Sequence, residues 1–105
     1  NDPELAAGWF FRAAEQGFAD AQFNLGLMYA YGEGVEKNMK QAVELFKKAA
    51  EQGHVDAQNN LGAMYFTGEG VERDTKKAIG WFEKAAAQGN ADAQANLEAI
   101  KAAEK

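Results

Sequence analysis

The stretch YGEGVEKNMKQA (residues 31–42) returns 36 residues later as TGEGVERDTKKA (residues 67–78), with the pentapeptide GEGVE unchanged. Two glycines so close together favour a tight turn, because glycine reaches positive φ angles without strain. A phosphate-binding loop is disfavoured, since the glutamates would repel phosphate and neither a lysine–threonine pair nor a strand follows. A calcium loop would need more carboxylates at alternating positions. We therefore predict a structural turn that is built the same way twice.

The period of 36 residues extends over the whole chain. AAEQG or AAAQG stands at 13–17, 49–53 and 85–89, DAQ begins at 20, 56 and 92, and NLG or NLE begins at 24, 60 and 96. Three unrelated short motifs that recur with the same spacing indicate an internal repeat. A period of this length is typical of solenoids. The chain has 105 residues, which is enough for one small domain.

Each repeat contains the patterns of two helices. The first has an apolar stripe at i, i+4, i+7 and i+8, namely Ala21, Leu25, Met28 and Tyr29, and again Ala57, Leu61, Met64 and Tyr65. The second has Ala42, Leu45, Phe46, Ala49 and Ala50, with copies 36 residues before and after. Plausible N-caps precede these second helices at Asp2, Asn38 and Asp74, and Gly17, Gly53 and Gly89 suit left-handed C-caps. Because no stretch alternates with period two, we predict no β-strands.

Gly26 and Gly62 fall inside the predicted first helices, where glycine costs about 1 kcal/mol relative to alanine. We expect them to allow close approach of a neighbouring helix. No single repeat can bury its own apolar stripe, so stability should come from stacking.

Composition excludes several classes of function. The net charge of −5 argues against nucleic acid as the main partner, and no apolar run approaches the roughly 20 residues that cross a bilayer. The absence of cysteine and serine removes disulfides and the commonest nucleophiles. The chain lacks an initiator Met and a signal segment, so we expect a processed chain or a fragment, and no compartment is predicted.

The single histidine, His54, stands at a predicted helix junction, where the other copies have Phe18 and Asn90. As a general base it would need a nucleophile and an orienting partner, which the sequence does not suggest. We therefore expect a junction or capping role for His54. No His or Cys cluster predicts a metal site, and we predict no cofactor and no catalytic residue.

The repeat resembles a known family. Leu25-Gly26-x2-Tyr29 followed by Ala42-x3-Phe46 is similar to the tetratricopeptide signature. The period of 36 and the G-x-G-V loop are more similar to the Sel-1-like repeat family, whose repeat runs A-x-A-Q-x-x-L-G-x-x-Y-x-x-G-x-G-V, then A-x-x-W/L-F, then A-A-x-x-G. On this resemblance, residues 1–17 are the second helix of a partial repeat, 18–53 and 54–89 are repeats, and 90–105 are a terminal first helix.

The resemblance implies an all-α, right-handed α-solenoid of antiparallel helix pairs, with about six helices. It also implies a non-catalytic scaffold or adaptor that binds a protein or peptide on its concave face, which the first helices line. The groove-facing positions would then be Asp20, Phe23, Leu27, Ala30, Tyr31, Asp56, Asn59, Ala63, Phe66 and Thr67. The alternative is a small-molecule binder or weak enzyme that uses the aromatic groove.

Two rows of polar residues on the first helices have two interpretations each. Asp20, Asp56 and Asp92 suit either a basic partner residue or the positive end of the helix dipole. Asn24, Asn60 and Asn96 suit either hydrogen bonds to a partner backbone or bonds across the helix pair. Lysines concentrate instead on the second helices, at 40, 47, 48, 76, 77 and 84, and predict a mixed-charge outer face.

The first predicted helix departs from its copies. Leu5 aligns with Gln41 and Lys77, and Phe11 aligns with Lys47 and Glu83. Together with Trp9, Leu5 and Phe11 should form an exposed apolar patch, and such patches usually mark contact sites. We expect a homodimer through this N-terminal helix, or else a monomer in which the patch folds back on its own helix pair.

Overall fold

The structure is a computed structural model, and it describes residues 2–104. It contains six α-helices of 13 residues each: α1 (Pro3–Glu15), α2 (Ala19–Tyr31), α3 (Met39–Glu51), α4 (Val55–Thr67), α5 (Thr75–Ala87) and α6 (Ala91–Ala103). Within the described range there is no β-strand. The predictions of six helices, no strands and an α-solenoid are confirmed.

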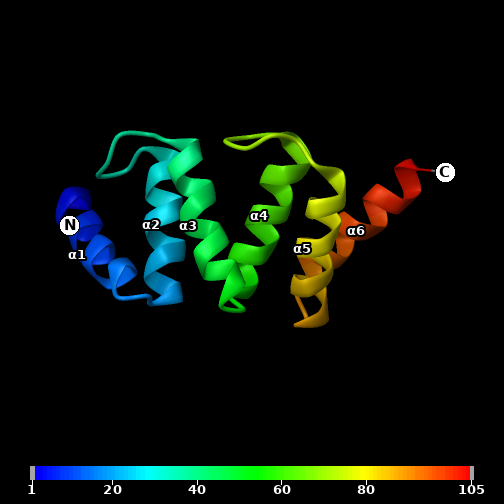
Figure 1. Cartoon of the computed structure of the whole chain (residues 1–105), viewed down its shortest axis with the longest axis horizontal. Coiled ribbons are helices and arrows are strands. Elements are labelled where there is room, and N and C mark those ends of the chain that lie inside the picture. Colours follow the sequence, from blue (N-terminus) through cyan, green and yellow to red (C-terminus); the bar gives the residue numbers. More distant parts are fainter. Residues whose placement is uncertain (1, 105) are drawn as a thin grey trace.

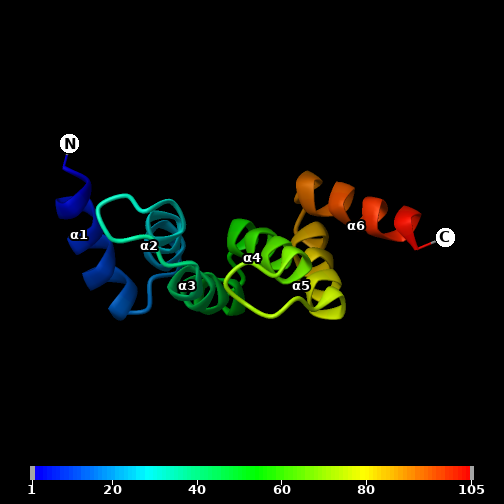
Figure 2. The same ribbon diagram turned by 90° about the horizontal axis from the view of Figure 1, so that it is seen from above.

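The helices stack one after another into an elongated body of 48 × 24 × 21 Å (Figure 1). Each helix packs against the helix that follows it, and successive helices run in opposite directions. Seen from above, α2, α4 and α6 lie along one side of the solenoid, and α3 and α5 lie along the other (Figure 2). The predicted first helices of the repeats therefore share one face, which we call the first-helix face.

The GEGVE segment is a turn in both copies, and it reaches back toward the preceding second helix (Figure 1). The backbone of Gly70 has a φ of +71°, and a Cβ placed there would lie 2.6 Å from the carbonyl oxygen of Met39, at the start of α3. Gly34 abuts Pro3 at the start of α1 in the same way. The second glycine of GEGVE thus allows the backbones of successive repeats to come into close contact. The sequence pattern did not predict this contact.

The predicted caps are confirmed at the second helices. The side chains of Asp2, Asn38 and Asp74 accept hydrogen bonds from backbone N–H groups two or three residues later, at 2.9, 3.0 and 3.1 Å. At the other end of α1, the Gly17 N–H donates to the carbonyl of Ala14 and the Phe18 N–H donates to that of Ala13. This pair of bonds is the Schellman motif, and α3 and α5 repeat it.

The core alternates small and large residues between the two layers of helices. Phe46 of α3 and Phe82 of α5 are each 2% exposed. A Cβ on Gly62 would lie 2.8 Å from the ring of Phe82, and Gly26 faces Phe46 at the same distance. The expected close approach at these glycines is confirmed, and its partner is the buried phenylalanine of the second helix.

Candidate functional site

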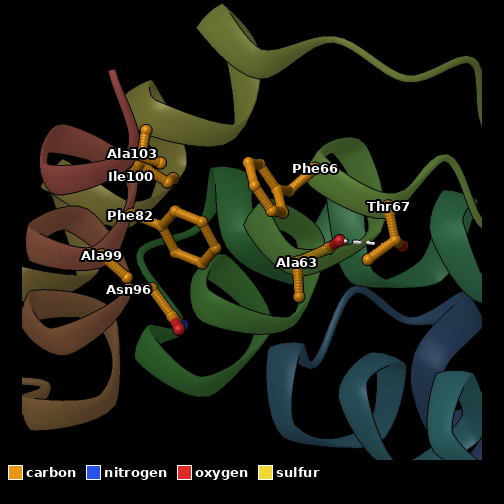
Figure 3. A pocket seen from close by; sticks show the side chains of 8 residues that line it. All are labelled: Ala63, Phe66, Thr67, Phe82, Asn96, Ala99, Ile100 and Ala103. Atoms are coloured by element: carbon orange, nitrogen blue, oxygen red, sulfur yellow. Dashed lines mark hydrogen bonds between the residues drawn. The ribbon is translucent and has the colours of Figure 1, made fainter. Parts of the chain in front are cut away.

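Two apolar grooves open on the first-helix face. Groove I lies between α2 and α4, has a volume of about 360 Å³, and is lined by Leu27, Ala30, Tyr31, Phe46, Asn60 and Met64, among others. Groove II lies between α4 and α6, has a volume of about 280 Å³, and is lined by Ala63, Phe66, Thr67, Phe82, Asn96 and Ile100, among others (Figure 3). Each of these six positions in groove II follows its counterpart in groove I by 36 residues, so the two grooves are copies of one site.

The two copies differ in shape because four of the six paired positions differ, and three of these differ strongly in side-chain size; the fourth pair is Met64 and Ile100. Leu27, Ala30 and Tyr31 in groove I correspond to Ala63, Phe66 and Thr67 in groove II. The large side chains therefore come from different positions, and the sites cannot accept identical side chains equally well. In groove II the rings of Phe66 and Phe82 both border the open space (Figure 3).

Six of the ten predicted groove-facing residues line these grooves, namely Leu27, Ala30, Tyr31, Ala63, Phe66 and Thr67. Phe23 does not line either groove. Its ring stacks on His54 with centroids 4.6 Å apart and lies 5.7 Å from the ring of Phe46. The ring of Phe23 therefore packs at the junction between two repeats.

The three aligned asparagines have three different surroundings. Asn24 donates a hydrogen bond to the carbonyl of Asp20 within its own helix, at 2.8 Å. Asn96 of α6 donates to Asn59 of α4, the first helix of the preceding repeat, at 3.3 Å. Asn60 lines groove I and makes no hydrogen bond to another residue of 2–104. One copy thus bonds within its own helix, one bonds between helices, and one presents its amide to the groove.

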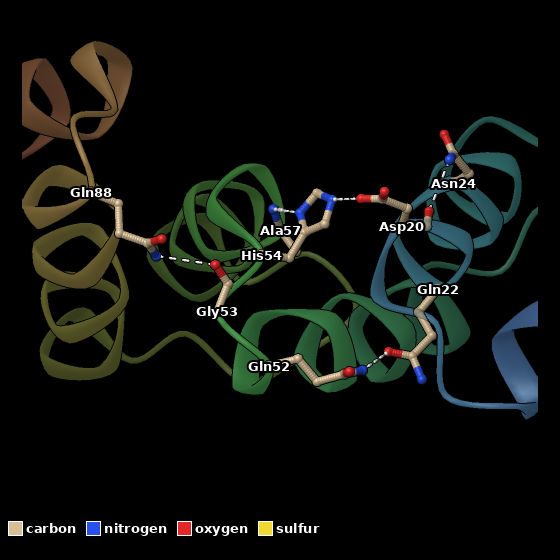
Figure 4. Close-up of polar contacts among 8 residues, drawn as sticks. All are labelled: Asp20, Gln22, Asn24, Gln52, Gly53, His54, Ala57 and Gln88. Carbon is tan, nitrogen blue, oxygen red and sulfur yellow. Dashed lines mark hydrogen bonds and ion pairs between the residues drawn. The ribbon is translucent and has the colours of Figure 1, made fainter.

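The row of aspartates is exposed, but one member has an internal partner. Asp20 Oδ1 lies 3.0 Å from His54 Nε2 (Figure 4). His54 Nδ1 accepts the backbone N–H of Ala57 at 3.1 Å, so the imidazole caps α4. The expected junction role of His54 is confirmed. Asp56 and Asp92 stand in the first turns of α4 and α6 and form no ion pair within residues 2–104.

Buried glutamines connect the repeats, and the sequence analysis missed them. Gln22 and Gln58 are 5% and 4% exposed and donate to the carbonyls of Ala14 and Ala50, near the ends of the preceding helices. Gln52 Nε2 donates in turn to Gln22 Oε1 at 2.8 Å (Figure 4), and Gln88 donates to Gln58 at 2.9 Å. The sequence does contain a pattern that could have indicated them, because a glutamine recurs in every copy of DAQ and another in every copy of A-A-x-Q-G. These bonds fix how one repeat is set against the next, and hence the shape of the grooves.

The opposite side of the solenoid carries the lysines. All six predicted outer-face lysines are exposed on α3 or α5, and Lys84 lies over the ring of Trp81 at 4.6 Å. Among residues 2–104, no group of three or more His, Cys, Asp or Glu side chains could hold a metal ion. In the same range, no helix has both the length and the hydropathy to cross a membrane.

The family model of the Sel1 repeat matches residues 1–18, 19–54 and 55–90. The chain belongs to the Sel1 repeat family. A Sel1 repeat protein from Oxalobacter formigenes has a crystal structure that matches 91% of this chain at 45% identity and a TM-score of 0.89. The protective antigen c5321 of uropathogenic Escherichia coli, described as displaying an SLR fold, matches 88% at 43% identity and a TM-score of 0.86. Helicobacter pylori cysteine rich protein B matches 87% at 30% identity and a TM-score of 0.82.

The chain spans 40% of the Oxalobacter protein, 20% of the E. coli antigen and 68% of the Helicobacter protein. The search of curated proteins found no match. Proteins of the Sel1 repeat family are generally scaffolds for protein–protein interaction. Unlike cysteine rich protein B, this chain contains no cysteine, so its repeats are held together without disulfides.

Proposed function

We propose that this Sel1 repeat chain is a non-catalytic interaction module that binds a segment of a protein partner in grooves I and II. The observation that carries the proposal is the recurrence of one apolar groove at an interval of one repeat. Two such sites side by side suit a chain-like ligand with more than one apolar side chain. Exposed apolar surface of this kind typically marks a contact site.

The alternative of a small-molecule binder or weak enzyme has less support. Groove II, the more enclosed site, has about 280 Å³, which is at the small end of the range for ligand pockets. The single histidine caps a helix through Nδ1 and contacts Asp20 through Nε2. No serine or cysteine is present to act as a nucleophile. A peptide groove therefore accounts for more of the observed features.

Replacing Phe66 with alanine is expected to weaken binding of a groove ligand by about 1–3 kcal/mol, the usual range for an aromatic anchor. Phe66 is only partly buried, so the helix content should not change. The ligands are peptides selected from a random phage-displayed library on the parent protein, and affinity is measured by fluorescence polarisation. Trp9→Ala, which removes an aromatic side chain from α1, serves as the matched control. If the selected peptides bind a Phe66→Ala, Tyr31→Ala double variant as tightly as the parent, the grooves are the wrong surface.

A second contact surface is proposed at the N-terminal helix. Leu5, Trp9 and Phe11 of α1 are 65%, 68% and 49% exposed, which supports a contact surface on this helix. At the opposite end of the solenoid, the exposed residues Glu98 and Lys101 of α6 replace the glycine and tyrosine of the inner repeats. An apolar end and a charged end do not complement each other, so α1 of one copy should pair with α1 of another. Such a contact would be symmetric.

The substitution Phe11→Lys is expected to weaken this self-association. Burial of Phe11 is worth about 2 kcal/mol in each of the two copies, so the dimer dissociation constant should rise roughly 1,000-fold. Analytical ultracentrifugation over a concentration series measures this constant. Tyr31→Lys places the same charge at an exposed aromatic position outside α1 and should leave it unchanged. A parent chain that stays monomeric at high micromolar concentration would rule out the pairing.

A further inference from the structure

We infer that the segment bound in the grooves is cationic: it carries Lys or Arg beside the apolar side chains that enter grooves I and II. The inference rests on the proposed function and specifies the chemistry of the partner. Its basis is the absence of basic residues from α2 and α4, together with the exposed aspartates on the groove-bearing helices.

Basic residues are absent from α2 and α4, whereas α3 and α5 carry both lysines and glutamates. Asp20 and Asp56 are the only charged residues of α2 and α4. Helix α3 has Lys40, Lys47 and Lys48, and α5 has Lys76, Lys77 and Lys84. Helices α2 and α4, which form walls of the grooves, therefore carry only negative side-chain charge. The other wall of groove II, α6, carries Asp92, Glu98 and Lys101.

The aspartates are in line with the groove walls. In α4, Asp56 shares one stripe with Asn60, Ala63 and Thr67, because side chains at i, i+4, i+7 and i+11 fall on one helix face. Ala63 and Thr67 line groove II, and Asn60 lines groove I. Asp56 is about 6 Å along the helix axis from Asn60. A ligand whose apolar side chain enters a groove thus brings its neighbouring residues next to a carboxylate.

Two of the three carboxylates are available to a ligand. Asp20 is engaged by His54, but Asp56 and Asp92 are exposed and form no ion pair with another residue of 2–104. The rim of groove I adds Glu69, together with Lys37. These two rim charges offset each other. At groove II the guanidinium of Arg73 lies 5.4 Å from the centroid of the Phe66 ring, so the carboxylates of Asp56 and Asp92 stand against this nearby cation. The net charge of −5 for the whole chain also favours a cationic ligand through long-range attraction.

The test begins with random twelve-residue peptides displayed on phage and selected on the parent protein. Each binder is measured again on Ala63→Trp, because Ala63 is exposed and lines both grooves, so a large side chain there obstructs both. Peptides that lose binding to Ala63→Trp are groove ligands. Among them, we expect Lys and Arg to be enriched over the starting library and Asp and Glu to be depleted.

Two double variants with equal net charge then distinguish the effect of the carboxylates near the grooves from the effect of the net charge of the whole chain. Asp56→Asn with Asp92→Asn is expected to weaken groove ligands roughly 3- to 30-fold at low salt, as for two exposed ion pairs. Glu44→Gln with Glu83→Gln removes two exposed acids from α3 and α5 and should change the affinity less than about twofold. The affinity for the parent should also fall as salt is added.

The outcomes distinguish this inference from the proposed function. Groove ligands that show no enrichment of Lys and Arg, or that bind the aspartate and glutamate variants equally well, would overturn the cationic partner and leave the peptide groove standing. If no selected peptide is sensitive to Ala63→Trp, the grooves are not the binding site, and both proposals fail.

Discussion

Replacing Gly70 with alanine is expected to lower the free energy of unfolding by about 3 kcal/mol. A left-handed backbone costs a residue with a Cβ roughly 1–2 kcal/mol, and Gly70 has a φ of +71°. The new Cβ would also lie 2.6 Å from the Met39 carbonyl oxygen and 2.7 Å from its carbonyl carbon. These are backbone atoms in the first turn of α3, so they cannot move aside as a side chain does. Overpacking of this kind costs about 1–3 kcal/mol.

Two other glycines separate the cost of backbone strain from the cost of the clash with α3. Gly53 has a φ of +91°, but a Cβ added to it would meet no atom within 4 Å, so Gly53→Ala should cost only the roughly 1–2 kcal/mol of backbone strain. Gly80 lies within α5, also with open space, so Gly80→Ala should stabilise the chain by up to about 1 kcal/mol. Urea denaturation followed by circular dichroism gives all three values. Equal costs for Gly70→Ala and Gly53→Ala would show that the turn does not press against α3.

The features that the sequence predicted well are local or repeated. The caps at Asn38 and Asp74 depend on backbone groups only three residues away, and the structure has both bonds. The six helices follow from an apolar periodicity that each copy repeats in the same register. Because three copies show the same apolar pattern, the prediction of the helices does not depend on a chance pattern in any one copy.

The features that the sequence did not predict depend on contacts between helices, both within a repeat and from one repeat to the next. The bond from Gln52 to Gln22 joins residues 30 apart, and the approach of Gly70 to Met39 joins residues 31 apart. Neither pair shares a helix, so no helical periodicity places its members together. The same holds for the stacking of Phe23 on His54, which the sequence did not predict. The grooves themselves were anticipated as a face, but their division into two copies of one site required the packing of α2, α4 and α6.

Replacing Phe82 with alanine is expected to have the largest effect, a loss of about 3–5 kcal/mol of unfolding free energy. Its side chain is 2% exposed, packs against α4 at Gly62, and forms part of the lining of groove II. Truncation therefore opens a cavity under the groove as well as between the helices. Phe66→Ala is the matched control, because Phe66 lines the same groove but is only partly buried, and it should cost less stability. Phe82→Leu provides a milder variant that should remain folded where Phe82→Ala does not.

The contact between Gly62 and Phe82 can be isolated with a double-mutant cycle. In the parent, Gly62→Ala places a Cβ 2.8 Å from the Phe82 ring and should cost about 1–3 kcal/mol, despite the better helix propensity of alanine. In the Phe82→Ala background the ring is absent, so Gly62→Ala should stabilise the chain by about 1 kcal/mol. The sign of the effect is thus expected to reverse between the two backgrounds, and Phe82→Leu should give an intermediate value. A cost for Gly62→Ala that is the same in all three would mean that the glycine is not there to accommodate the phenylalanine, and that some other contact holds α4 and α5 at this distance.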